Sequence, residues 1–259
     1  MALSLIQDAL GLVCGGLVGF SLGLVGGGGS ILAVPLMVYV VGLRDPHLAI
    51  GTSAAAVALN AGVNLVPHAR RGSVIWSSAL VFAATGVVGA ALGSTLGKAF
   101  DGQKLLALFA GLMVVVGGLM LRPRPEGGNH KPQLHAIQIV KLGVAGAATG
   151  ALSGFFGIGG GFLIVPALMA ATDMPILNAV GTSLVSVAAF GVTTAVNYAL
   201  GGMVDWGVAL VFIAGGVAGG MGGAALAHRL AAARGALNRV FAALIFIVAG
   251  YVLYRSLRL

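Results

Sequence analysis

Two glycine-rich stretches decide the fold of this chain: GGGGSILAVPL at residues 26–36 and GIGGGFLIVPAL at residues 157–168. Each follows a long apolar run and leads into a short apolar segment that contains a proline. Consecutive glycines destabilise an α-helix by about 1 kcal/mol each. We therefore expect a helix to break at both places.

The two stretches occupy matching places in two copies of one unit, about 130 residues apart. Further matches are Gly15, Gly19 and Gly23 with Gly146, Gly150 and Gly154; Gly51-Thr52-Ser53 with Gly181-Thr182-Ser183; Gly72 and Trp76 with Gly202 and Trp206; and Phe109-Ala110 with Phe241-Ala242. The predicted organisation is a first membrane repeat at residues 1–121, a polar linker at 122–135 and a second membrane repeat at 136–259.

Composition indicates that lipid surrounds both copies. Apolar residues make up 59% of the chain and charged residues 8%, whereas about a quarter of the residues of a soluble domain are charged. Six acidic and fourteen basic residues cannot form the charged shell that a soluble protein with so large a core would need. The basic residues flank apolar runs instead of forming one patch, which is typical of membrane topology and argues against a nucleic-acid partner. The predicted fold class is an all-α polytopic membrane protein.

Apolar runs bounded by charges, prolines or glycine clusters predict about eight to ten membrane segments. Their bounds are 5–25, 30–43, 47–67, 74–97, 104–121, 136–156, 160–171, 175–200, 206–228 and 237–254. Segments 30–43 and 160–171 are too short to span, since at ~1.5 Å per residue the longer reaches about 21 Å against a hydrocarbon core of ~30 Å. We interpret both as half-helices or tilted fragments.

The topology of the copies depends on these short segments. If every segment crosses, each copy has five crossings and the second copy is inverted, as in many secondary transporters. If each short segment completes the crossing of the run before it, each copy has four crossings and the copies are parallel. We favour inversion, because with ten crossings and the N-terminus outside, more of the basic loops fall inside.

The glycine breaks are the predicted substrate site. Irregular backbone at membrane depth survives only where protein or a water-filled cavity satisfies its polar groups. Exposed N–H groups and the positive end of the following helix then favour an anion. The alternative is close helix packing, which we assign to the glycines spaced by four residues, as in Gly11 to Gly23. The site residues predicted from the breaks are Gly26, Gly27, Gly28, Gly29, Ser30, Gly157, Gly159, Gly160 and Gly161.

A polar stripe follows each short segment. The first stripe consists of Ser53, Asn60 and Asn64, within about 40° of one another on a helix. The second consists of Ser183, Ser186, Thr194 and Asn197, within roughly 80°. Polar faces of membrane helices point into the bundle, where they line a pathway or form interhelical hydrogen bonds. We favour the pathway, because the stripe recurs in both copies beside the breaks.

The charged and histidine residues argue for an anion and against other site types. All six acids, Asp8, Asp45, Asp101, Glu126, Asp173 and Asp205, fall at or near segment ends. No carboxylate therefore marks a cation or metal site in a span, and no cofactor is expected. His68 and His228 also lie at segment ends, and we interpret them as interfacial residues. An intramembrane enzyme would need a nucleophile with a base in reach, which the spans do not offer.

The two stretches, each followed by GTS and then by G-x-V-x-W or G-x-V-D-W, resemble the TauE/SafE sulfite exporter family over nearly the whole chain. The resemblance implies a multi-pass carrier of the bacterial inner membrane that moves sulfite, thiosulfate or sulfonated organic acids, driven by the proton gradient. Motif positions of the family would add Pro35, Thr52, Pro166 and Thr182 to the site. One departure is Ile75, which stands where the second copy has Asp205; if that acid serves coupling, only one copy supplies it.

The function predicted from the sequence is secondary transport of a small sulfur-containing anion, bound between the two breaks and exposed to each side in turn. The alternative is an anion channel that uses the same glycine-rich site. The oligomeric state stays open, a homo-oligomer included.

Overall fold

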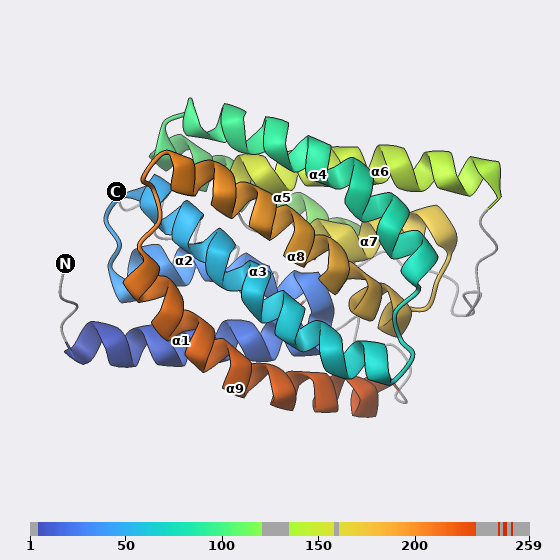
Figure 1. The fold of residues 1–259 in the computed structure, drawn as a ribbon, viewed down its shortest axis with the longest axis horizontal. Helices are drawn as coiled ribbons and strands as arrows, with labels where there is room; N and C mark the ends of the chain where they lie inside the picture. Colours follow the sequence, from blue (N-terminus) through green and yellow to red (C-terminus); the bar gives the residue numbers. More distant parts are fainter. Residues whose placement is uncertain are drawn as a thin grey trace.

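The computed structural model describes residues 5–120, 135–157 and 161–231, together with Ala243, Phe246, Ile247 and Gly250. Every regular element in these ranges is helical (Figure 1). The elements are α1 (Leu5–Val25), the 3₁₀ helix η1 (Gly26–Leu32), α2 (Ala33–Leu36), the π-helix η2 (Met37–Val41), α3 (Pro46–Arg70), α4 (Trp76–Lys98), α5 (Gly102–Met120), α6 (Ala136–Phe156), α7 (Gly161–Thr172), α8 (Ile176–Leu200) and α9 (Trp206–Ala231).

The helices confirm the predicted fold class of an all-helical, polytopic membrane protein. Among the described residues, six helical stretches are long and apolar enough to cross a membrane. They are Ile6–Val41, Pro46–Arg70, Trp76–Lys98, Ala136–Phe156, Ile176–Leu200 and Trp206–Leu230. The short segment α7 has 12 residues, as the sequence predicted. The predicted segment 237–254 and all but one residue of the predicted linker lie outside the described ranges or touch them only at isolated positions.

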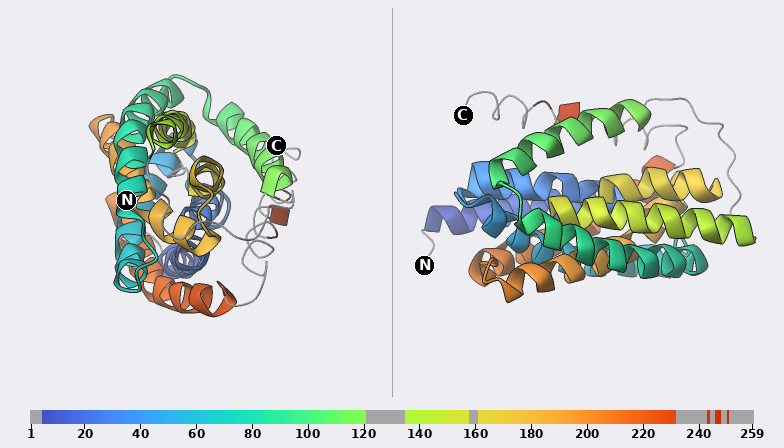
Figure 2. Two further views of the ribbon diagram at one scale, coloured as in Figure 1. Left: turned by 90° about the vertical axis from the view of Figure 1, so that its right-hand side faces the viewer. Right: turned by 90° about the horizontal axis from the view of Figure 1, so that it is seen from above.

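Helices that pack most closely come from different halves of the chain, the first half being residues 1–121 and the second 136–259. The main pairs are α1 with α9, α4 with α6, and α3 with α8. In the left view of Figure 2, the α1–α9 pair and the α4–α6 pair lie at opposite ends of the cross-section. The helices of the two halves therefore interleave.

Glycines spaced by four residues form the seams of these pairs, as predicted. A Cβ atom on Gly15 would lie 2.0 Å from the carbonyl oxygen of Phe212, and one on Gly150 would lie 2.1 Å from that of Gly86. The backbones approach so closely that no side chain fits between them. This is the small-residue packing of membrane helices.

Helices at corresponding places in the two halves run in opposite directions along the long axis of the molecule. In Figure 1, α1 runs against α6, α3 against α8, and α4 against α9. The central α3 and α8 lie side by side, between the α1–α9 and α4–α6 pairs. The candidate functional site lies where the glycine breaks meet this central pair.

Candidate functional site

The first glycine break is a sharp change of direction at one residue. Helix α1 ends at Val25, and Gly26 takes a φ of 62°, a left-handed conformation that favours glycine. The chain then continues as η1, which packs back on α1, so that a Cβ atom on Gly29 would lie 2.1 Å from the Leu22 nitrogen. Irregular backbone was expected here, but the segment is a 3₁₀ helix, whose own i to i+3 bonds satisfy much of the backbone.

The second break begins in the same way. Helix α6 ends at Phe156, and Gly157 has a φ of 65°. Helix α7 begins at Gly161. The predicted site residues Gly159 and Gly160 lie outside the described residues.

Each break is held by the central helix of the opposite half. The Gly27 N–H donates to Ser183 Oγ of α8 at 3.0 Å. Ser53 Oγ of α3 donates to the Gly157 carbonyl oxygen at 3.3 Å and lies 2.9 Å from the Ile50 carbonyl oxygen. A Cβ atom on Gly26 would meet Ser183 Oγ at 2.6 Å. The structure thus places each break beside one of the two serines that the sequence predicted, and in both cases the serine belongs to the other half.

The threonines of the GTS motifs bind the beginnings of helices that belong to the other half of the chain. Thr52 Oγ1 accepts the Asp205 N–H at 2.9 Å, and Thr182 Oγ1 accepts the Ile75 N–H at 3.0 Å. The Asp205 carboxylate caps α9 by accepting the Val208 N–H at 3.1 Å. Both hydroxyls and this carboxylate are therefore engaged in helix joints.

The polar stripe of α3 faces the seam between α1 and α9. Asn60 and Asn64 are buried, and their side-chain amides lie where Cβ atoms on Gly216 and Gly220 would be. The Asn64 Nδ2 group donates to the Asn60 carbonyl oxygen at 2.9 Å. Neither amide atom of Asn60 has a hydrogen-bond partner in the described part of the chain.

The stripe of α8 divides into two parts. Ser186 and Thr194 are fully buried, and within the described ranges their hydroxyls have no partner. Asn197 is only partly buried and donates to Ser94 Oγ at 2.6 Å. The Lys98 ammonium group donates to Asn197 Oδ1 at 2.6 Å. Asn197 therefore joins α8 to the end of α4.

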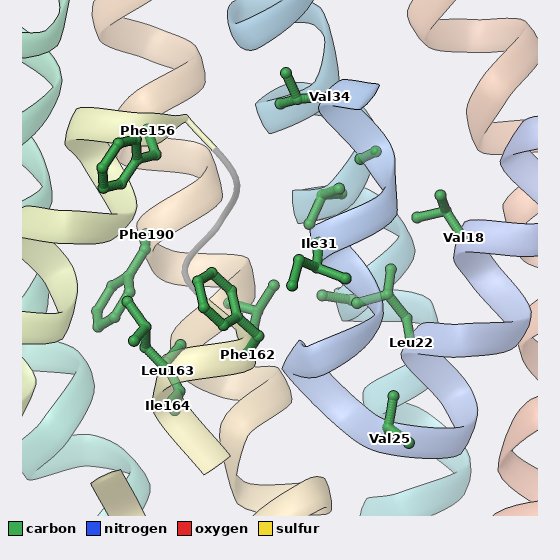
Figure 3. Packing of buried hydrophobic residues seen from close by; sticks show 14 of the residues in the cluster. Val18, Leu22, Val25, Ile31, Val34, Phe156, Phe162, Leu163, Ile164 and Phe190 are labelled. Carbon is green, nitrogen blue, oxygen red and sulfur yellow. The ribbon is translucent and has the colours of Figure 1, made fainter. Parts of the chain in front are cut away.

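Buried apolar side chains lie between η1 and α7 in this conformation. Phe162 of α7 and Ile31 of η1 face each other, and both are fully buried (Figure 3). Leu22 of α1 lies beside Ile31 on the side away from Phe162. An anion bound between the breaks would require α7 and η1 to separate.

The interpretation of His68 as an interfacial residue is wrong. Its side chain is fully buried, with Nε2 3.0 Å from the Gly23 carbonyl oxygen and Nδ1 3.2 Å from Ser73 Oγ. The ring of the partly buried His228 lies 5.3 Å away between centroids. A signal for this burial was present in the sequence, since His68 follows Asn64 by four residues and so continues the polar stripe of α3.

Comparison with known proteins identifies the family. The model of the sulfite exporter TauE/SafE family matches residues 11–252. A probable membrane transporter protein of Xylella fastidiosa is 55% identical over 245 residues, which cover 93% of each chain. The probable membrane transporter protein YunE of Bacillus subtilis is 30% identical over 247 residues, covering 87% of this chain and 89% of YunE. No solved structure matches. The chain belongs to the sulfite exporter TauE/SafE family of membrane transporters.

Proposed function

We propose that this transporter carries a small sulfur-containing anion, of the sulfite, thiosulfate or organosulfonate class, across the bacterial inner membrane by proton-coupled alternating access. The family supports the anion class. The chemistry of the candidate site is consistent with it, because the described groups around the breaks are hydroxyls, amides and backbone N–H groups. Neutral donors hold an anion without the strong attachment of a buried Arg or Lys.

The observation that carries the proposal is the exchange of contacts at the breaks. Gly27 is bound to Ser183, and Gly157 to Ser53, so each break is attached to the half that does not contain it. Because Ser53 belongs to α3 and Ser183 to α8, sliding of α3 against α8 would displace both breaks together. Opposite helix directions and interleaved packing also support two inverted repeats at residues 1–121 and 136–259, the arrangement in which alternating access exposes one site to each side.

Among the described residues, the buried side chains of Asn60, Ser186 and Thr194 carry hydrogen-bonding groups without a partner, and we propose that the anion meets them in turn along its path. A buried polar group without a partner costs about 1–3 kcal/mol, and such a cost is typical of functional positions. We place the substrate where these groups and the glycines of the breaks can be reached once Phe162 and Ile31 separate. The predicted glycine set, together with Ser30, Ser53 and Ser183, remains the proposed site.

Replacement of Ser186 by alanine tests the site without removing a protein hydrogen bond. We expect Ser186→Ala to keep or raise the unfolding temperature, because a buried unpaired hydroxyl is lost. Sulfite and thiosulfate uptake into proteoliposomes should fall by roughly tenfold, as expected for one lost hydrogen bond to an ion. Ser78→Ala is the matched control, since Ser78 of α4 is also fully buried and unpaired among the described residues. Equal uptake by both variants and the unchanged protein would contradict the proposed site.

The channel alternative makes a different kinetic prediction. A carrier saturates with substrate and exchanges labelled anion against unlabelled anion across the membrane. A channel lets the labelled anion run down its gradient without such exchange. Uptake that rises linearly with sulfite concentration, without counterflow, would reject alternating access.

A further inference from the structure

His68 is a buried ionisable residue that lies outside the proposed anion site. It is fully buried at the end of α3, where α1 and α9 also meet. Its Nε2 atom contacts the carbonyl oxygen of Gly23, three residues before the first break. On its other side, Nδ1 contacts Ser73 Oγ, which in turn lies 2.9 Å from the carbonyl oxygen of His68 itself.

These three contacts can all be hydrogen bonds only when the ring is protonated. A carbonyl oxygen accepts but does not donate, so Nε2 must carry a hydrogen. In the neutral ring Nδ1 then has none, and the single hydroxyl hydrogen of Ser73 can serve either Nδ1 or the His68 carbonyl oxygen. In the charged ring Nδ1–H donates to Ser73 Oγ, and the hydroxyl is free to donate to the carbonyl. Protonation therefore reorients the Ser73 hydroxyl and completes the network.

The network reaches both halves of the molecule. Ser73 contacts the GTS motif of α8, because a Cβ atom on Gly181 would lie 2.8 Å from Ser73 Oγ. The Asn178 side chain, also of α8, donates to the Ser73 carbonyl oxygen at 3.2 Å. On the other side, Gly23 belongs to α1 and precedes the break. A change of charge on His68 is thus felt at one break and at the helix that holds it.

Charged and titratable groups around the ring come from two elements. His228 of α9 lies 5.3 Å away between ring centroids, and its Nε2 atom is buried without a partner among the described residues. Arg71, at the end of α3, donates to the Ala224 carbonyl oxygen at 3.4 Å. Both groups repel a positive charge on His68 when they are charged themselves. Hydrogen bonds therefore stabilise a proton on His68, whereas the positive charges nearby destabilise it. This balance allows the proton to be released again.

The arrangement belongs to the first half alone. Tyr198 stands at the place of His68 in the second half, and Met203 at that of Ser73. Neither side chain could exchange a proton near neutral pH, since tyrosine ordinarily ionises near 10 and methionine does not ionise.

We propose that His68, beside His228, is the proton-binding site of this transporter, and that its protonation sets how firmly α1 and α8 hold the first break. The role in coupling rests on the proposed transport function. Proton binding itself does not, so the two can fail separately.

Nitrogen NMR of ¹⁵N-histidine-labelled protein in lipid nanodiscs tests proton binding without any substrate. His68→Gln assigns the His68 signals by their loss. We expect the His68 ring to change between its neutral and charged forms over the pH range in which the protein stays folded, and Ser73→Ala to shift the midpoint. A ring that keeps one form over the whole range, or a midpoint indifferent to Ser73→Ala, would overturn the proposal.

Proteoliposomes loaded with sulfite test coupling. We expect His68→Gln to reduce accumulation driven by a pH gradient at least tenfold and to retain sulfite exchange at equal pH. His47→Gln is the matched control, since His47 lies on the same helix and its Nε2 also contacts a carbonyl oxygen, that of Phe100, at 3.0 Å. Full accumulation in His68→Gln, or loss of exchange as well, would overturn the proposal. If that variant does not fold, Ser73→Ala must alter the pH dependence of uptake. No sulfite or thiosulfate uptake by the unchanged protein would instead refute the proposed function and leave the NMR result standing.

Discussion

Adjacent residues of the GTS motif have different tasks, although the sequence suggests one. Thr182 and Ser183 are successive residues of α8, about 100° apart around the helix. Thr182 therefore faces the beginning of α4, where it accepts the Ile75 N–H, and Ser183 faces Gly27. Thr52 and Ser53 divide the same tasks in α3. The motif can thus hold a helix joint and a glycine break at once.

Gly26 should be the residue of the first break least tolerant of a side chain. In Gly26→Ala the left-handed backbone costs about 1–2 kcal/mol, and the new Cβ atom meets Ser183 Oγ and the Val180 carbonyl oxygen, each at 2.6 Å. Overpacking of this kind costs a further ~1–3 kcal/mol. We expect a lower unfolding temperature in detergent and loss of uptake.

Gly72→Ala separates these two effects. Gly72 has a similar φ of 68°, but in the part of the chain that the structure describes no atom lies within 4 Å of the position of its Cβ. This control should show only the backbone cost. If both substitutions lower the free energy of unfolding by the same amount, the contact of the new Cβ atom at position 26 with Ser183 adds no cost.

At the scale of the elements, apolar runs predicted the helices closely. The segment 136–156 coincides with α6, and 47–67 lies inside α3, because charges, prolines and glycines end helices locally. The packing partner of each helix could not be predicted from the sequence. A four-residue glycine spacing shows that a helix packs closely but not against which neighbour, since many other helices are equally apolar. The burial of His68 was missed for the same reason: a residue near a helix end is at the surface unless other helices cover it.

The seam glycines allow a test of the packing of α4 against α6. In Gly150→Ala the Cβ atom would lie 2.1 Å from the Gly86 carbonyl oxygen, a backbone atom that cannot rotate away. The helices must separate, and we expect a loss of stability of about 1–3 kcal/mol. Gly111→Ala in α5 should do the opposite, gaining up to about 1 kcal/mol of helix propensity, because no atom of the described residues lies within 4 Å of the place of its Cβ. Thermal unfolding of both variants checks this, and equal melting temperatures would refute close packing at Gly150.

For the whole molecule, the interleaving of helices from the two halves restricts which parts can move as rigid bodies. Helices α1 and α9, or α4 and α6, are joined by backbone-to-backbone seams although each pair spans both halves. Rigid movement is therefore more readily pictured between the two outer pairs, with α3 and α8 sliding between them, than between residues 1–121 and 136–259 as blocks. The repeat stays a prediction from the sequence, whereas this regrouping depends on contacts between distant residues, 64 positions apart for Gly86 and Gly150 and 197 for Gly15 and Phe212.

A disulfide between α3 and α8 tests whether these helices must move past each other. Ala58 Cβ lies 2.9 Å from the place of a Cβ atom on Gly191, so a slight separation brings Ala58→Cys and Gly191→Cys to the ~3.8 Å typical of a disulfide. In a Cys14→Ser background, oxidation should reduce sulfite uptake at least about tenfold, and reduction should restore it. Each single-cysteine variant controls for the oxidant. Uptake that persists in fully cross-linked protein would show that α3 and α8 stay together through the cycle, and would place the moving boundary at the glycine breaks alone.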